Sequence, residues 1–171
     1  IRNPKSEMPR TLPFQFTPVD APTPLDPPNP HVKATTQMPE IVEALKAQFG
    51  DGVEEVTEYA GETTVRVGRA RIVEVCRFLR DQHGFTYLAD LGGIDRFTEE
   101  DRYEVYYNTL SMQKAKRLRL KVRVDEDAMT VPSVTGVWMS ANWNEREVYD
   151  MFGIHFEGHE DLRRMYMPED F

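Results

Sequence analysis

The sequence has little that could hold a cofactor. Its 171 residues include a single cysteine, Cys76, so the chain offers neither an internal disulfide nor a thiolate cluster for zinc or iron–sulfur ligation. We expect Cys76 to be a small buried hydrophobic residue on a helix. The adjacent Gly92 and Gly93 lack the spacing of a nucleotide-binding loop and predict a turn instead.

The sequence also has no long apolar run and no excess of positive charge. No stretch approaches the roughly 20 apolar residues that span a bilayer, so we expect membrane association only through partner proteins. The 21 basic and 29 acidic residues give a net charge of -8, whereas nucleic-acid binders normally carry a basic footprint. The hydrophobic content of 40% is that of a globular protein.

Proline is concentrated near one end of the sequence. Ten of the twelve prolines lie within residues 1–39, and proline fixes φ and lacks an N–H donor. Residues 1–37 are therefore predicted to form an extended N-terminal arm. Two interpretations remain open: a disordered tail, or an arm along a partner surface, anchored by Leu12, Phe14, Phe16, Val19 and Leu25.

Residues 38–153 have the patterns of an α+β domain. Apolar residues at helical spacing predict helices near 39–49 and 70–82. Strand patterns occupy 52–67, as two strands around a turn at 60–61, then 85–91, 102–111 and 116–124. Hairpins rather than βαβ crossovers connect these strands. We predict a two-layer domain, with an antiparallel or mixed sheet and helices on one face.

The segment 116–124 alternates most strictly. Its basic residues point one way and its apolar residues the other, in the order Lys116, Arg117, Leu118, Arg119, Leu120, Lys121, Val122, Arg123, Val124. This row of like charges predicts a solvated sheet face or a docking surface for an acidic partner. RNA binding is disfavoured because no aromatic residues interleave with the basic ones.

From Pro132 onward the pattern predicts a helix through Phe152, ended by Gly153. Its apolar stripe contains Val134, Trp138, Ala141, Val148, Tyr149 and Phe152. Glu145 falls within this stripe, where a carboxylate is costly unless it is paired or hydrogen-bonded. Arg146 and Asp150 lie four residues apart on another face and could pair along the helix.

The run from Trp143 to Ile154, WNEREVYDMFGI, resembles the signature of the C subunit of bacterial NADH-quinone oxidoreductase. The same family includes the mitochondrial iron–sulfur protein 3 of complex I. Further matches follow in the same order at 106–108, 110–111, 118–122, 131–133, 156–159 and 162–164. The resemblance covers about residue 38 to the end. It departs from the family at Glu160, where proline is usual.

This resemblance implies a peripheral-arm protein without catalytic residues, metal or cofactor of its own. Such a protein is expected to support structurally the quinone-reducing module of a proton-translocating NADH:quinone oxidoreductase. Its expected neighbours are the D subunit, which forms the quinone site, and cluster-bearing subunits. FMN, iron–sulfur clusters and quinone are expected in other subunits. The expected location is the cytoplasmic side of the bacterial inner membrane, or the matrix side in mitochondria. Alternatives are the homologous component of a membrane-bound hydrogenase or another donor:quinone oxidoreductase, and a soluble binding module.

The signature residues are interpreted as a device for docking onto other subunits, with residues 154–171 as an extended docking tail. The set comprises Trp143, Glu145, Arg146, Glu147, Asp150, Phe152, Gly153, Gly158, His159, Leu162, Arg163 and Arg164. We expect Glu145 and Asp150 to pair with Arg163 and Arg164, or these arginines to reach the quinone-site subunit.

Two chemical readings of the same segment are disfavoured. His155 and His159 have the spacing of metal ligands on a helix, but Gly153 and Gly158 argue against a helix there. Glu145, Glu147 and Asp150 could suggest a hydrolase, but no convincing nucleophile or oxyanion hole accompanies them.

Overall fold

The computed structural model describes residues 38–97, 102–168 and 170. The predicted N-terminal arm, residues 1–37, lies outside these residues. The helices are α1 (Pro39–Phe49), α2 (Ile72–His83) and α3 (Ala141–Phe152), with short 3-10 turns at Gly50–Gly52, Arg69–Arg71 and Glu126–Ala128. The strands are β1 (Val53–Tyr59), β2 (Glu62–Val67), β3 (Tyr87–Asp95), β4 (Tyr103–Ser111), β5 (Lys116–Val124), β6 (Thr130–Pro132) and β7 (His155–Glu157).

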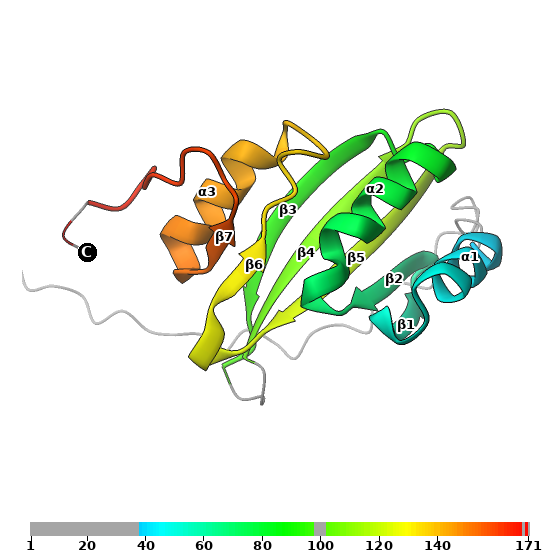
Figure 1. Cartoon of the computed structure of the whole chain (residues 1–171), viewed down its shortest axis with the longest axis horizontal. Coiled ribbons are helices and arrows are strands. Elements are labelled where there is room, and N and C mark those ends of the chain that lie inside the picture. Colours follow the sequence, from blue (N-terminus) through cyan, green and yellow to red (C-terminus); the bar gives the residue numbers. More distant parts are fainter. Residues whose placement is uncertain (1–37, 98–101, 169, 171) are drawn as a thin grey trace, which may run out of the picture. The chain divides into compact units, whose positions relative to one another are not determined.

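The strands β1 to β5 form one mixed sheet in the order β1-β2-β5-β4-β3. Strands β2 and β5 are parallel, with Val65 opposite Leu120, while the other neighbours are antiparallel. Figure 1 shows α1 and α2 on the same face of this sheet. The predicted two-layer α+β fold is therefore confirmed.

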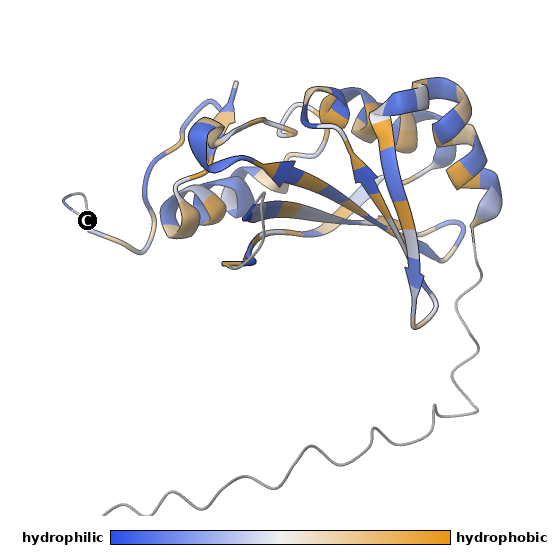
Figure 2. Ribbon diagram, turned by 90° about the horizontal axis from the view of Figure 1, so that it is seen from below, coloured by the Kyte–Doolittle hydropathy of each residue, from blue (hydrophilic) through white to orange (hydrophobic). Residues whose placement is uncertain are grey.

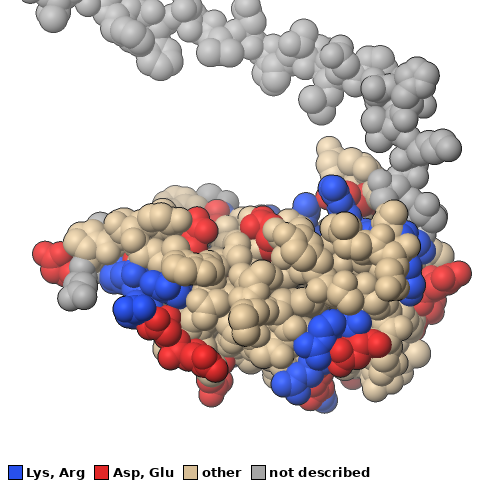
Figure 3. Space-filling model, turned by 90° about the horizontal axis from the view of Figure 1, so that it is seen from above, with Lys and Arg blue, Asp and Glu red and all other residues tan. Residues whose placement is uncertain are grey.

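The core lies between this face and the two helices. Helix α1 buries Ile41, Val42 and Leu45, and α2 buries the apolar side on which Cys76 lies. Hydrophobic and hydrophilic residues alternate along the strands (Figure 2), because successive side chains of a strand point to opposite faces. On the face that Figure 3 draws, acidic and basic side chains lie next to one another, with largely uncharged surface between these groups.

Helix α3 packs along β3, which is an edge strand of the sheet. Side chains of α3 and the turn before it donate hydrogen bonds to carbonyl groups of β3 and the residues preceding it: Trp138 Nε1 to Phe85 (3.1 Å), Ser140 Oγ to Leu88 (3.4 Å) and Asn144 Nδ2 to Leu91 (3.3 Å). An uncovered edge strand would present unpaired backbone groups to other chains. These donors, together with α3 itself, cover that edge.

The helix predicted from Pro132 to Phe152 is wrong in its first part. Helix α3 begins only at Ala141, and turns occupy most of the preceding segment. Pro132 belongs to β6, which pairs in parallel with β7, and the N–H of Ser133 donates to the carbonyl of Glu157 at 2.8 Å. This pairing holds the backbone extended, so a helix cannot start there.

The predicted boundary between domain and tail at residue 153 also needs correction. Ile154 and Phe156 are buried in the core, because β7 pairs with β6 inside the domain. Residues 154–157 are therefore part of the packed body. No helix within the described residues is long and apolar enough to cross a membrane.

Candidate docking site

Glu145 is fully buried on the inner side of α3, as its position within the apolar stripe predicts. Its carboxylate accepts two hydrogen bonds of 2.7 Å, from the Ser133 hydroxyl and from the N–H of Val134. Burial raises the pKa of Glu145 to about 7, and these hydrogen bonds only partly oppose the shift. The predicted arginine partner for Glu145 is wrong, because the turn after β6 brings these donors to the carboxylate instead.

Asp150 holds the C-terminal segment. One of its carboxylate oxygens accepts the backbone N–H groups of Met165 (2.9 Å), Tyr166 (2.6 Å) and Met167 (3.0 Å). Its other oxygen accepts a hydrogen bond from Arg164 at 3.2 Å, so the predicted pair of these two residues is confirmed. Desolvation opposes ionisation, but the three N–H groups and Arg164 outweigh it and lower the pKa of Asp150 to about 2.

Arg146 binds the same segment through its carbonyl groups. Its guanidinium donates to the carbonyl of Arg163 at 3.1 Å and to that of Arg164 at 3.5 Å. It also lies 4.9 Å from the centre of the Trp143 ring, in cation–π geometry. The predicted pair with Asp150 along the helix is not formed, because each of the two side chains binds the returning chain.

His159 fixes the turn that leads into this segment. Its Nδ1 accepts the N–H of Asp161 at 3.0 Å, so the ring proton belongs on Nε2, which lies 3.1 Å from the carbonyl of Asn142. Gly153 ends α3 in the left-handed region, with φ of 76°. Gly158 has φ of 84°. Residues other than glycine rarely adopt this backbone conformation.

The remaining predicted site residues are divided between surface and core. Arg163 is exposed and pairs with Asp161 at 2.7 Å, so it holds neither Glu145 nor Asp150. Leu162 and Phe152 pack against the core, and Glu147 is exposed on α3.

The outer side of α3 and the turn before it present large apolar groups to solvent. Met139, Trp143 and Met151 follow one another at intervals of four or eight residues, and 86%, 62% and 56% of their areas are exposed. Tyr166, in the segment that Asp150 holds, is 65% exposed. We call these four residues and Glu147 the α3 surface. Groups of exposed apolar side chains commonly mark interaction sites.

The described residues offer no arrangement suited to metal binding. They contain no group of three or more His, Cys, Asp or Glu side chains placed to hold an ion. Both ring nitrogens of His159 face protein groups, and His155 packs near Tyr149. Burial, together with the charge of Glu145, raises the pKa of the Cys76 thiol, which makes it a poor nucleophile.

Sequence reasoning missed most partners of the signature residues, including the backbone groups of the C-terminal segment that bind Arg146 and Asp150. Ser133 and Val134 bind Glu145, and the carbonyl of Asn142 faces His159. The family match at 131–133 indicates that this segment matters for the signature. Because a helix was predicted there, Ser133 and Val134 were not expected to bind Glu145.

The comparisons with known proteins agree with this geometry. Residues 65–171 match the family described as the respiratory-chain NADH dehydrogenase, 30 Kd subunit. The chain belongs to this family. It is 45% identical over 133 residues to the C subunit of NADH-quinone oxidoreductase from Roseiflexus sp. (strain RS-1), covering 77% of this chain and 76% of the relative. The second C subunit of the same enzyme from Rhizobium etli (strain CIAT 652) is 46% identical over 129 residues, with 74% and 68% covered.

Two solved structures have a similar fold, and the first of them supports the assignment. The trypsin-resistant fragment of Nqo5 superposes with a TM-score of 0.65 at 34% identity, covering 72% of this chain and 97% of the fragment. A chain of the membrane-bound sulfane sulfur reductase, an archaeal respiratory membrane complex, has a TM-score of 0.65 at 22% identity, covering 77% of this chain and 76% of that one. The second likeness shows the fold alone. The predicted identity as a subunit of NADH:quinone oxidoreductase is confirmed.

Proposed function

We propose that the chain is a rigid brace in the peripheral arm of an NADH:quinone oxidoreductase and holds no cofactor of its own. Membership of the 30 kDa subunit family supports this role. Electron transfer and quinone chemistry need neighbouring subunits held within narrow tolerances, and well-packed elements provide such tolerances better than loops. FMN, iron–sulfur clusters and quinone then belong to other subunits.

The observation that carries the proposal is the double attachment of the C-terminal segment to α3. Arg146 binds carbonyl groups of residues 163–164, and Asp150 binds N–H groups of residues 165–167. An extended chain would otherwise lose considerable conformational entropy on docking. The two attachments order it beforehand beside the exposed Trp143, so less entropy remains to be lost when a partner binds.

The proposed occupant of the α3 surface is the quinone-site subunit, with cluster-bearing subunits as further neighbours. Trp143 is the expected anchor, because tryptophan is enriched among the few residues that dominate binding energy at interfaces. Through these partners the chain would lie at the membrane without crossing it, on the cytoplasmic side in bacteria or the matrix side in mitochondria.

Trp143→Lys tests the proposal in the assembled complex. With an affinity tag on this chain, mass spectrometry measures how much of the quinone-site subunit is recovered with it. We expect recovery to fall at least about tenfold, the effect of losing a central anchor, while turnover per assembled complex stays unchanged. Met112→Lys is the matched control, because Met112 is also exposed but lies at the end of the β4–β5 hairpin.

Two outcomes would contradict the proposal. The first is normal assembly of the Trp143→Lys complex with turnover abolished, which would assign this chain a direct part in the chemistry. The second is recovery of the wild-type chain alone, without a quinone-site subunit.

A further inference from the structure

On the face of the main sheet opposite α1 and α2, Glu104 binds the basic side chains around it. Its buried carboxylate accepts hydrogen bonds from Arg96 (2.8 and 2.9 Å) and Lys121 (3.2 Å). Arg66 and Arg123 lie within 4.0 Å of the same carboxylate. The cluster around Glu104 is thus held together by ion pairs within the chain.

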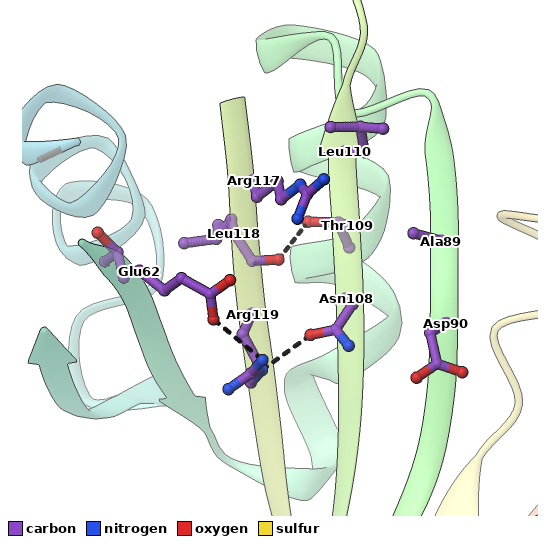
Figure 4. A pocket seen from close by; sticks show the side chains of 10 residues that line it. Glu62, Ala89, Asp90, Asn108, Thr109, Leu110, Arg117, Leu118 and Arg119 are labelled. Atoms are coloured by element: carbon purple, nitrogen blue, oxygen red, sulfur yellow. Dashed lines mark hydrogen bonds and ion pairs between the residues drawn. The ribbon is translucent and has the colours of Figure 1, made fainter. Parts of the chain in front are cut away.

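A hollow of about 270 Å³ on the same face is lined by charges of both signs. Glu62 and Asp90 supply two carboxylates, and Arg117 and Arg119 supply two guanidinium groups. Arg119 is bound within the chain, by Glu62 at 3.1 Å and by the side-chain oxygen of Asn108 at 2.8 Å (Figure 4). The hollow therefore favours a partner of neither sign of charge, and the apolar α3 surface is the stronger basis for docking.

The α3 surface is also distinguished by its methionines. Within the described residues, the exposed methionines are Met139 (86%), Met112 (70%) and Met151 (56%). Met139 and Met151 belong to the α3 surface, four residues before Trp143 and eight residues after it, whereas Met112 lies at the end of the β4–β5 hairpin. The expected anchor of docking is thus accompanied by two thioether groups that are open to solvent.

An exposed thioether reacts with hydrogen peroxide. One oxygen atom passes from the peroxide to the sulfur as the O–O bond breaks, so the sulfur is oxidised by two electrons and the peroxide is reduced to water. The product, methionine sulfoxide, is polar and disrupts interfaces that contain methionine. Cys76 is a poorer target, because it is fully buried and burial raises the pKa of its thiol, which leaves little reactive thiolate.

We propose that Met139 and Met151 are oxidation sites for peroxide that control whether the free chain docks through the α3 surface. As thioethers, both side chains add apolar area to the surface that contains Trp143. As sulfoxides, they place polar oxygen atoms in the interface, where a buried acceptor without a donor is costly. The inference rests on the proposed function, because it concerns docking through the same surface. Oxidation takes place before assembly, since a docked partner covers both side chains.

Peroxide treatment of the tagged full-length chain tests the proposal. The chain is treated with hydrogen peroxide, freed of peroxide and added to an extract of cells that lack this chain. Mass spectrometry measures the quinone-site subunit recovered with it and the oxygen gained at each methionine. We expect recovery to fall at least about tenfold, because the buried apolar area of two methionines is lost from the interface. Methionine sulfoxide reductases with a dithiol reductant should restore recovery, since they return the sulfoxides to thioethers.

The double variant Met139→Leu/Met151→Leu assigns the effect to these two side chains, because leucine is apolar and has no sulfur to oxidise. The recovery from each protein is divided by that of its own untreated sample, so an effect of leucine on affinity cancels. Peroxide should then leave this ratio near one in the double variant. Met112→Leu is the matched control and should lose recovery as the wild type does, because Met112 is exposed outside the α3 surface.

Two results would overturn the inference. The first is an equal loss of recovery in the double variant and the wild type, which would make another oxidised group responsible. The second is full recovery with the oxidised wild type although both methionines carry the added oxygen. If Trp143→Lys releases the quinone-site subunit in either case, the proposed function stands and only the inference about the methionines fails.

Discussion

The carboxylate of Asp150 accepts the backbone N–H of Tyr166 at 2.6 Å, the shortest of its three bonds to consecutive amides. This contact joins the last turn of α3 to a segment 16 residues further along the chain. The three bonds hold residues 165–167 in a fixed position against α3.

Asp150→Asn should loosen these residues. The amide keeps one oxygen acceptor but loses the negative charge that attracts Arg164, and its NH₂ group cannot accept a hydrogen bond from an N–H. We expect the amides of Met165, Tyr166 and Met167 to exchange with deuterium at least about tenfold faster, a typical sign of local opening. Hydrogen exchange followed by mass spectrometry measures this directly.

Glu147→Gln is the control for that experiment, because Glu147 is exposed on the same helix. It should leave the three amides as protected as in the wild type.

The stability that Asp150 contributes should also depend on pH. Because the pKa of Asp150 is lowered to about 2, this contribution is complete above the unfolded pKa near 4 and is lost as pH falls toward 2. Protection that stays the same in Asp150→Asn would show that other contacts hold the segment.

Glu145→Gln should remove a pH dependence from the stability of the domain. The pKa of Glu145 is raised from 4.5 to about 7, so between these values the folded chain binds a proton that the unfolded chain has lost. Its contribution is greatest below pH 4.5 and is lost as pH rises toward 7. Relative to wild type, the unfolding free energy of the variant should gain about 2–3 kcal/mol between pH 5 and 8.

Denaturant titrations at several pH values measure this gain. Glutamine still offers an oxygen to the N–H of Val134, and the Ser133 hydroxyl can accept from its NH₂ group. Glu145→Ala leaves the N–H of Val134 buried without its acceptor and should destabilise the domain at every pH. Glu157→Gln, at an exposed position on β7, serves as the control. Parallel pH profiles for wild type and Glu145→Gln would mean that Glu145 is ionised throughout.

The regular elements of the main sheet could be predicted because their patterns are local. The strict alternation in 116–124 gives β5 with its observed bounds, and the apolar spacing near Ile41 and Leu45 gives α1. The cluster around Glu104 was not predicted, since it depends on the register that places Glu104 opposite Arg123. Register follows from the packing of whole strands rather than from one segment.

The segment before α3 shows the opposite case. Pro132 suits the first turn of a helix, and Val134 continues the apolar stripe, so local rules favour a helix. Pairing of β6 with β7 overrides them, and it is a long-range contact that the local pattern does not contain. The burial of Glu145 followed from the stripe alone, whereas the identity of its donors depended on this pairing.

Gly93→Ala should displace α3 from the sheet. A Cβ at Gly93 would lie 2.6 Å from the ring of Phe152, closer than packed carbon atoms approach. Overpacking of this kind costs typically about 1–3 kcal/mol, so the unfolding free energy should fall by that amount. Gly136→Ala is the control, because nothing lies within 4 Å of a Cβ there.

A double variant tests whether Phe152 is the cause. Adding Phe152→Leu to Gly93→Ala should cost less unfolding free energy than the sum of the two single changes, since the smaller side chain leaves room for the methyl group. A Gly93→Ala chain as stable as Gly136→Ala would show that Phe152 moves aside without cost, and that the contact of Phe152 with Gly93 does not fix α3 on β3.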